Sequence, residues 1–279
     1  MTTEEGRAAP AVAANGPRPP RLLQRVAVIT GGNRGLGRVI GEAFAREGAY
    51  LVLASRAGDS LASTAKELEA LGQPVMAVPC DVGREEDVTR LFAEVDAIHG
   101  RVDVLVNNGA ISGPTRAVAD LDLSDWEETL QIDLTGQFLC TREAVRRMIP
   151  RRRGAILSIG SIFGPKRPYP LRSPYAAAKA GLVALTQALA WEVGPHGIRV
   201  NAMLPGPVQG ERIERVWKAR ADARGVPMER IRDKMIAMSA MRRLPTPEEV
   251  ATLAVFLCSD EASAMTGQAI NLTAGMEMR

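Results

Sequence analysis

Short apolar runs rich in β-branched residues recur along the chain from residue 25 onward: "VAVIT", "YLVLA", "VMAVPC", "VDVLVN", "GAILSI", "IRVNAML" and "QAINLT". Most are uninterrupted rather than alternating with polar residues, which is typical of strands covered on both faces. Helical patterns lie between them over 35–47, 60–71, 84–99, 124–149 and 174–194. This alternation predicts the α/β class, with one Rossmann-type, doubly wound, parallel seven-stranded sheet.

The seven runs account for nearly the whole chain, so we expect a single domain over residues 24–279. Residues 1–23 are rich in Ala, Pro and Gly and have no apolar periodicity, which predicts a disordered tail. Only residues 207–245, helical in pattern and rich in Met and Arg, interrupt the alternation as an insertion. The sequence shows neither a signal peptide nor a long apolar span, so we expect a cytoplasmic protein that does not bind membranes.

Composition excludes several classes of function. The net charge of +3 is too small to indicate nucleic-acid binding. The three cysteines, Cys80, Cys140 and Cys258, lack metal-ligand or redox spacing and are expected in the core. With only His99 and His196 present, a zinc site or a Ser-His-Asp triad is hard to build. We therefore predict chemistry without a metal.

The first apolar run ends in the glycine-rich stretch "TGGNRGLG". In a doubly wound sheet, ligands bind beyond the carboxyl ends of the strands, where this stretch falls. Gly31 permits a tight turn, and the absence of side chains at Gly35 and Gly37 lets a pyrophosphate approach the backbone. Because position 40 is Ile, this is not the G-x-G-x-x-G fingerprint, and a glycine-rich turn without a ligand stays the alternative.

The end of the second run, "LASR", has no carboxylate of the kind that holds the ribose 2′-hydroxyl of NAD. Asp59, just beyond it, is expected as a helix N-cap. Arg34 and Arg56, one from each turn, could instead meet a 2′-phosphate through charge-assisted hydrogen bonds. Two solvated loop arginines are the alternative. Their joint position favours NADP(H) over NAD(H).

Six motifs occur in one order along the chain: "TGGNRGLG", "CDV" at Cys80–Val82, "NNGA" at Asn107–Ala110, "SIGS" at Ser158–Ser161, "YAAAK" at Tyr175–Lys179 and "PG" at Pro205–Gly206. Together they resemble the short-chain dehydrogenase/reductase family, most of all its 3-oxoacyl-carrier-protein reductases. The resemblance implies an enzyme that interconverts a ketone and a secondary alcohol with a nicotinamide cofactor. It does not indicate which ketone.

The resemblance also implies a set of cofactor-binding residues. One pair borders the adenine, the "NNGA" segment passes along the cofactor, and the segment after "PG" lies near the nicotinamide. A threonine that often follows "PG" is absent, and Gln209 or Gly210 stands near its place. The expected cofactor-binding residues are Gly31, Asn33, Arg34, Gly35, Leu36, Gly37, Ser55, Arg56, Asp81, Val82, Asn108, Gly109, Ala110, Tyr175, Lys179, Pro205, Gly206 and Val208.

Four residues are expected to be catalytic. Tyr175 and Lys179 are four apart on a helix, so both project from one face. A phenol exchanges protons poorly at neutral pH until a cation such as Lys179 stabilises its anion. Ser161 would hydrogen-bond the substrate oxygen that Tyr175 protonates. Asp133, in "QIDLTGQF", replaces an asparagine that, in the family, completes a water relay to the lysine.

Other features stay open at this stage. The apolar side chains of the insertion could form a lid over the nicotinamide or pack it onto the body: Trp217, Met228, Met235, Met238 and Met241. Arg212, Arg215 and Arg220 could meet an acidic substrate or a phosphopantetheine arm, or form one solvated face. Some members of this fold bind dinucleotides only as sensors or scaffolds. The stretches 124–149 and 174–194 resemble the pair through which family members dimerise, and the chain stops soon after the last strand, so we expect a homotetramer.

Overall fold

The computed structural model describes residues 18–278 and contains a parallel sheet of seven strands. The strand order is β3-β2-β1-β4-β5-β6-β7. This order reverses between β1 and β4, which places a crevice at the carboxyl ends of those two strands. The strands are β1 (Val26–Thr30), β2 (Tyr50–Ser55), β3 (Val75–Pro79), β4 (Val104–Asn107), β5 (Gly154–Ile159), β6 (Ile198–Pro205) and β7 (Ala269–Leu272). The predicted fold class is confirmed.

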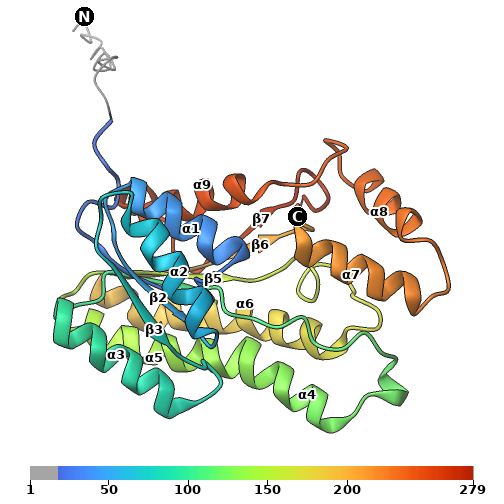
Figure 1. The fold of residues 1–279 in the computed structure, drawn as a ribbon, viewed down its shortest axis with the longest axis horizontal. Coiled ribbons are helices and arrows are strands. Elements are labelled where there is room, and N and C mark those ends of the chain that lie inside the picture. The colour runs from blue at the N-terminus through green and yellow to red at the C-terminus, as the bar shows by residue number, and fades with distance from the viewer. Residues whose placement is uncertain (1–17, 279) are drawn as a thin grey trace, which may run out of the picture.

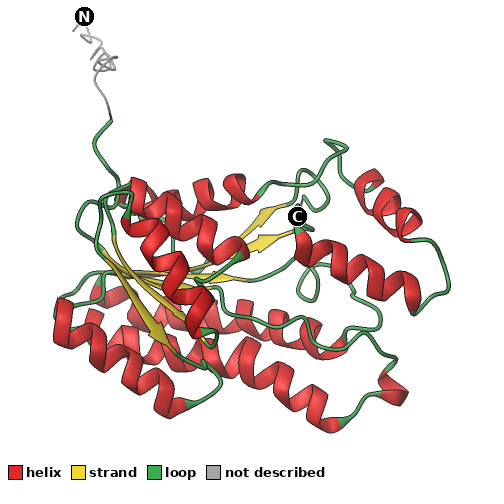
Figure 2. Cartoon of the chain, viewed as in Figure 1, coloured by secondary structure: helices red, strands yellow, loops and turns green. Residues whose placement is uncertain are grey.

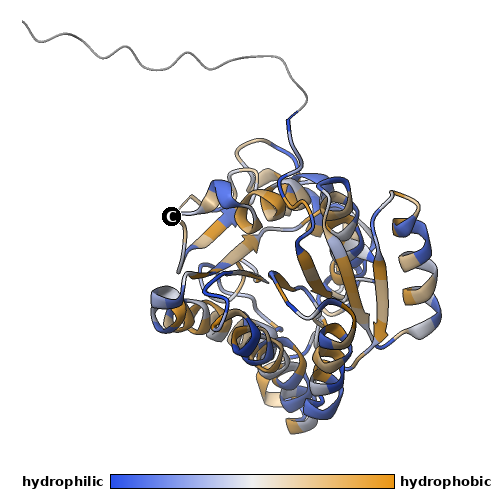
Figure 3. Cartoon of the chain, turned by 90° about the vertical axis from the view of Figure 1, so that its left-hand side faces the viewer, coloured by the Kyte–Doolittle hydropathy of each residue, from blue (hydrophilic) through white to orange (hydrophobic). Residues whose placement is uncertain are grey.

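Helices cover both faces of the sheet (Figures 1 and 2). One layer holds α1 (Gly35–Arg46), α2 (Gly58–Glu69) and α9 (Pro247–Cys258), and the other holds α3 (Glu85–His99), α5 (Gly136–Met148) and α6 (Ser173–Val193). Alternate strand residues feed the two cores: Ala27 and Ile29 face one, whereas Val26 and Val28 face the other. This is why the strands read as continuous apolar runs, and Figure 3 shows them as orange ribbons between the helices.

The predicted helix over 124–149 is interrupted by a turn of wider helix. It divides into α4 (Leu123–Leu130), a π-helical turn over Gln131–Thr135, and α5. The π turn is followed by Gly136, the first residue of α5, where an added Cβ would lie 2.7 Å from the carbonyl oxygen of Val82. Only a glycine allows this close approach of the helix to the loop after β3. Such π turns frequently mark functional sites.

Two local expectations differ from the structure. Asp59 is not an N-cap: α2 begins one residue earlier, at Gly58, and Asp59 lies in its first turn, where a carboxylate still favours the positive end of the helix dipole. Part of the predicted tail packs onto the body, since Leu22 is fully buried in the core and Arg21 pairs with Glu47. Residues 1–17 of that tail lie outside the described residues.

The insertion after β6 forms two helices, α7 (Glu211–Asp222) and α8 (Met228–Ala237). In Figure 1 they lie beyond the ends of β6 and β7. Trp217 and Met235 are buried in a third core with Tyr169, whereas Met238 and Met241 are exposed. The first two side chains therefore pack the insertion onto the body.

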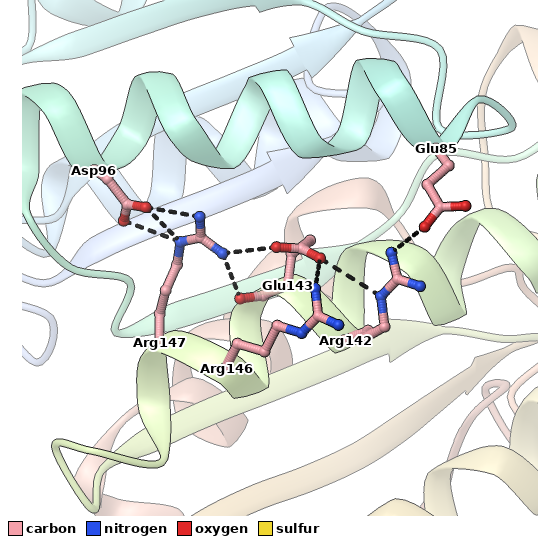
Figure 4. Close-up of polar contacts among 6 residues, drawn as sticks. All are labelled: Glu85, Asp96, Arg142, Glu143, Arg146 and Arg147. Carbon is pink, nitrogen blue, oxygen red and sulfur yellow. Dashed lines mark hydrogen bonds and ion pairs between the residues drawn. The ribbon is translucent and has the colours of Figure 1, made fainter.

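An ion-pair network joins α3 to α5 (Figure 4). Glu143 is buried and accepts from Arg146 at 2.7 Å and from Arg147 at 2.9 Å. Arg147 also binds Asp96 on α3 at 2.7 Å, and Arg142 reaches Glu85 at 2.6 Å. Because the central carboxylate is buried and shared, this network differs from the isolated surface pairs elsewhere on the chain.

Glu143→Ala is expected to destabilise the fold by about 2–3 kcal/mol, because it leaves several guanidinium groups without their shared carboxylate. For a chain of this size the melting temperature should fall by about 5 °C or more. Differential scanning calorimetry measures this. Glu86→Ala is the matched control, since its side chain is 80% exposed and lies 3.9 Å from Arg84. Equal melting temperatures for the two variants would show that the network contributes no stability.

Candidate active site

The turn after β1 and the loop after β4 are joined by hydrogen bonds at the switch point of the sheet. The Thr30 hydroxyl accepts from the backbone N–H of Asn108 at 3.0 Å and of Gly109 at 2.9 Å. The Asn108 amide donates to the carbonyl oxygens of Thr30 and Gly31 at 2.9 and 3.2 Å. Sequence reasoning named Asn108 but missed Thr30, whose signal was its place at the end of a strand.

Two of the predicted glycines are required by this geometry. Gly31 has φ +64°, and its Cβ would lie 2.9 Å from the Asn108 amide nitrogen. At Gly37 an added Cβ would lie 2.2 Å from the carbonyl oxygen of Gly31. Gly35, with φ +54°, has nothing within 4 Å of its Cβ position, so the backbone there is open to a ligand. This bare backbone at the N-terminus of α1 fits a pyrophosphate.

A pocket opens at the carboxyl ends of β1, β2, β3 and β4. Its lining gathers five segments that are distant in sequence, and it includes eight of the predicted cofactor-binding residues: Gly31, Asn33, Ser55, Arg56, Asp81, Val82, Gly109 and Ala110. It also includes residues that the sequence did not predict to bind the cofactor: Ala54, Ala57, Cys80, Ile111 and Ile132. The flat, partly apolar lining beside polar groups fits the adenosine half of a dinucleotide.

The other predicted cofactor residues border this pocket or lie further along the edge of the sheet. Arg34, Leu36 and Gly37 belong to the turn and the start of α1. At the end of β6, Pro205 pairs with Leu272 of β7 and Gly206 donates to its carbonyl oxygen at 3.0 Å. Val208 packs against the core next to α9. Gln209 is tied back to Pro245 and Leu244.

The two predicted phosphate-binding arginines differ in their surroundings. Arg34 is exposed at the N-cap position of α1, and the structure gives its guanidinium no ion pair within residues 18–278. Arg56 is 57% exposed and lies 3.7 Å from Asp81, a contact that the sequence did not reveal. Ser55, at the end of β2, is buried and accepts from the backbone N–H of Ala57 at 3.2 Å.

Three of the predicted catalytic residues belong to the loop that follows β5 and to α6. Lys179 is only 2% exposed, and its ammonium group donates to the carbonyl oxygen of Ile159 at 3.2 Å and lies 5.6 Å from the ring centre of Tyr175. Ser161 follows β5 and accepts from the backbone N–H of Phe163 at 3.1 Å. The same loop touches α6 at Gly164, where a Cβ would lie 2.4 Å from the carbonyl oxygen of Ala176.

Asp133 lies in the π turn and is fully buried. One carboxylate oxygen accepts from the backbone N–H of Ile111 at 2.7 Å, and the other lies 3.7 Å from the Lys179 ammonium, beyond hydrogen-bond distance. Burial raises the pKa of Asp133, while the charge of Lys179 and the Ile111 N–H oppose that rise. The second oxygen and the lysine are thus placed to share a small polar ligand such as water.

Comparison with known proteins identifies the family. The family model described as enoyl-(acyl carrier protein) reductase matches residues 31–277. The 3-oxoacyl-[acyl-carrier-protein] reductase FabG of Aquifex aeolicus is 33% identical over 92% of this chain and 98% of its own length. Dehydrogenase/reductase SDR family member 4 of Sus scrofa is 32% identical over 92% of this chain and 89% of its own length. The chain belongs to the short-chain dehydrogenase/reductase family.

Solved structures of other oxidoreductases have the same fold. NAD⁺-bound xylitol dehydrogenase has a TM-score of 0.88 at 28% identity and covers 91% of this chain and all of its own. A variant of actinorhodin polyketide ketoreductase with NADPH has a TM-score of 0.86 at 33% identity, over 91% of this chain and 97% of its own. This chain is therefore an oxidoreductase that uses a nicotinamide dinucleotide. The two neighbours hold different cofactors, so they do not choose between NAD and NADP.

Among residues 18–278, no helix is long and apolar enough to cross a membrane. The same residues contain no group of three or more His, Cys, Asp or Glu side chains that could hold a metal ion. All three cysteines are buried and free, which agrees with their expected place in the core.

Proposed function

We propose that this protein is an NADP(H)-dependent ketoreductase that interconverts a ketone and a secondary alcohol. The observation that carries the proposal is the buried Lys179 ammonium beside the ring of Tyr175, next to the loop that holds Ser161. When bound, the nicotinamide supplies or accepts the hydride. The chain's own residues orient the carbonyl group and move the proton.

In the reducing direction, the Tyr175 hydroxyl donates its proton to the carbonyl oxygen of the substrate. Lys179 favours the phenolate that results, because a buried cation close to the ring stabilises negative charge strongly in a medium of low polarity. The Ser161 hydroxyl donates to the same carbonyl oxygen and orients it. In the oxidising direction the proton returns to Tyr175.

The preference for NADP(H) rests on the end of β2. No carboxylate stands there to accept from a ribose 2′-hydroxyl. Arg34, in the turn after β1, and Arg56, directly after β2, are both exposed. A guanidinium can bind a phosphate through two parallel hydrogen bonds. The weak contact of Arg56 with Asp81 leaves Arg34 as the stronger candidate.

The proposed function is tested by following NADPH and NADH oxidation with a panel of ketones at neutral pH. A reductase consumes NADPH only when ketone is present, and it forms the secondary alcohol in equal amount. Cofactor binding without turnover of any ketone, or of any alcohol in the reverse direction, would favour the second candidate, a dinucleotide-binding sensor or scaffold. The intact set of Tyr175, Lys179 and Ser161 supports the enzyme.

We propose that Asp133 takes the relay position beside Lys179. Its bond to Ile111 needs only an acceptor oxygen, which an asparagine also provides. Asp133→Asn should therefore keep kcat within about tenfold of wild type, whereas Asp133→Ala should lose on the order of a hundredfold. Steady-state kinetics measures both. Equal and negligible losses in the two variants would remove Asp133 from proton transfer.

The same carboxyl makes stability depend on pH. Because its pKa is raised on folding, the folded protein holds the proton more tightly than the unfolded chain. Deprotonation therefore costs stability as pH rises above the unfolded pKa of about 4, while at lower pH both states are protonated and the cost vanishes. Asp133→Asn should melt above wild type at pH 8, with the difference closing toward pH 4. A difference independent of pH would contradict this.

We propose a homotetramer, because the two long helices that the family uses for dimerisation expose large apolar side chains. Phe138 on α5 is 41% exposed and Trp191 on α6 is 88% exposed. Light scattering at micromolar concentration should give four times the mass of the chain. Trp191→Arg should lower that mass, whereas Ile98→Arg, at an exposed position on α3, should not. A monomeric wild type would overturn the proposal.

A further inference from the structure

Two buried arginines contact the ring of Tyr169, which neighbours Tyr175, and we call them the arginine cluster: Arg172 and Arg220. Arg172 is the N-cap residue of α6, three positions before Tyr175, and is only 2% exposed. Arg220 belongs to α7 of the insertion and is 8% exposed. Tyr175 itself is partly exposed, so solvent reaches the residue beside the cluster.

Aromatic rings hold the cluster close to the proposed proton donor. The guanidinium carbons of Arg172 and Arg220 lie 5.4 and 5.1 Å from the ring centre of Tyr169. That ring meets the ring of Tyr175 edge-on, with 5.8 Å between the centres. Arg172 is also 5.6 Å from the centre of the Tyr175 ring. Arg172 therefore lies against the ring of Tyr175 itself, and Arg220 reaches that ring through Tyr169.

The charge of the cluster is not balanced by the protein. Within residues 18–278, neither guanidinium is ion-paired with a carboxylate, in contrast to Arg167, which pairs with Glu277. Arg172 donates to the Thr115 hydroxyl at 3.1 Å and to the carbonyl oxygen of Ser112, but both acceptors are neutral.

One donor nitrogen of each arginine also has no hydrogen-bond partner. The Nε atoms of Arg172 and Arg220 are buried without a hydrogen-bond partner, and so is the indole Nε1 of Trp217, one turn before Arg220 on α7. Buried donors nearly always have partners, so the unpartnered Nε atoms of two arginines that share the Tyr169 ring suggest a place for an acceptor from outside the described residues.

The surroundings of Arg172 also make its positive charge unfavourable in the absence of a bound anion. Burial lowers the pKa of Arg172, and the nearby charges of Arg212 and Arg220 act in the same direction, against the two tyrosines. A guanidinium nevertheless stays protonated in proteins. Burying an unpaired charge is unfavourable, and a bound anion would offset that cost.

We propose that the substrate is a keto acid, or the corresponding hydroxy acid, whose carboxylate is held by the arginine cluster while its carbonyl group faces Tyr175. This rests on the proposed function. A carboxylate matches the planar guanidinium fork, accepts several hydrogen bonds through its two oxygens, and carries one negative charge. Arg220 then determines specificity without touching the reacting atoms.

The test compares keto acids with neutral ketones of the same shape. Pyruvate, acetoacetate and levulinate vary the spacing between carbonyl and carboxylate, and diacetyl, acetylacetone and acetonylacetone replace one carboxylate oxygen of each by a methyl group. We expect kcat/KM for the best keto acid to exceed that of its neutral partner by at least about tenfold. Arg220→Met should lower the keto-acid value about tenfold to a hundredfold and leave the neutral ketone within about twofold.

Arg215→Met is the matched control, since Arg215 lies on the same helix, is 65% exposed and pairs with Glu211 at 3.6 Å. It should change neither value. A wild type that prefers the neutral ketones, or an Arg220→Met variant that lowers both classes equally, would mean that the cluster only joins α7 to the body, and the proposal fails while the ketoreductase stands.

If no ketone is turned over, a binding measurement tests the carboxylate site separately from the proposed ketoreductase activity. Isothermal titration of the NADPH-loaded protein with each keto acid then measures the anion site alone. Binding that is lost in Arg220→Met but kept in Arg215→Met supports the arginine cluster even though the reaction assigned to the site is wrong. No binding of any of the three keto acids overturns it.

Discussion

Tyr175→Phe is expected to lower kcat by about a thousandfold or more while NADPH still binds. The change removes one oxygen atom and leaves the ring, which packs edge-on against Tyr169 and lies 5.6 Å from both Lys179 and Arg172. The fold should therefore be unchanged. Only the hydroxyl that exchanges the proton with the substrate is lost.

Single-turnover kinetics and the fluorescence of bound NADPH measure these two effects separately. Tyr50→Phe is the matched control, because Tyr50 begins β2 and stacks on His99 at a distance from the strand ends that form the site. It should leave kcat within about twofold. A Tyr175→Phe enzyme that retains a tenth of wild-type activity would remove Tyr175 from the chemistry, whatever the control shows.

Arg34→Ala is expected to weaken NADPH about tenfold to a hundredfold while NADH changes little, since a charge-assisted hydrogen bond contributes about 1.5–3 kcal/mol. Arg56→Ala should cost less, because Arg56 already lies 3.7 Å from Asp81. The double variant need not show the sum of the two losses, since both groups would bind one phosphate. Ser55→Asp should favour NADH by accepting from its ribose and repelling the phosphate of NADPH.

The measurement is kcat/KM for both cofactors in each variant. Arg38→Ala is the control for the loss of a positive charge near this site, since Arg38 lies one turn further along α1 and pairs with Glu67 at 2.7 Å. It should affect neither cofactor. Equal weakening of NADPH and NADH in Arg34→Ala, or a wild type that already prefers NADH, would show that Arg34 does not recognise the phosphate.

Much of the proposed site could be predicted from local patterns in the sequence. Motifs that follow strands had to gather at one edge of a parallel sheet, and the pocket lined by Gly31, Ser55, Asp81 and Gly109 lies there. Spacing alone put Tyr175 and Lys179 on one helix face, and both lie beside the end of β5. These inferences needed only the period of each element and the right-handed connection of parallel strands.

The sequence did not predict the details that depend on contacts between residues distant along the chain. It predicted one continuous helix over 124–149, because a π turn keeps nearly the same apolar period and is decided by the close packing of Gly136 on Val82. Asp59 was predicted as the N-cap of α2, but the N-cap is Ala57 and Asp59 lies in the first turn. The reason is similar, because the path of the chain after β2 determines where α2 begins. Both depend on contacts between elements rather than on local preference.

The sequence by itself determined the seven-stranded doubly wound fold, the place of the proposed dinucleotide site and the residues that resemble a ketoreductase, because each follows from periodicity and from short motifs at strand ends. Only the tertiary structure decided which charges are balanced. It paired Arg56 with Asp81, set Asp133 against Lys179, and buried Arg172 and Arg220 against one tyrosine ring, with no carboxylate of residues 18–278 in an ion pair with either. Composition counts charges, but burial and the distance between side chains from different elements determine what each charge costs and what it can bind.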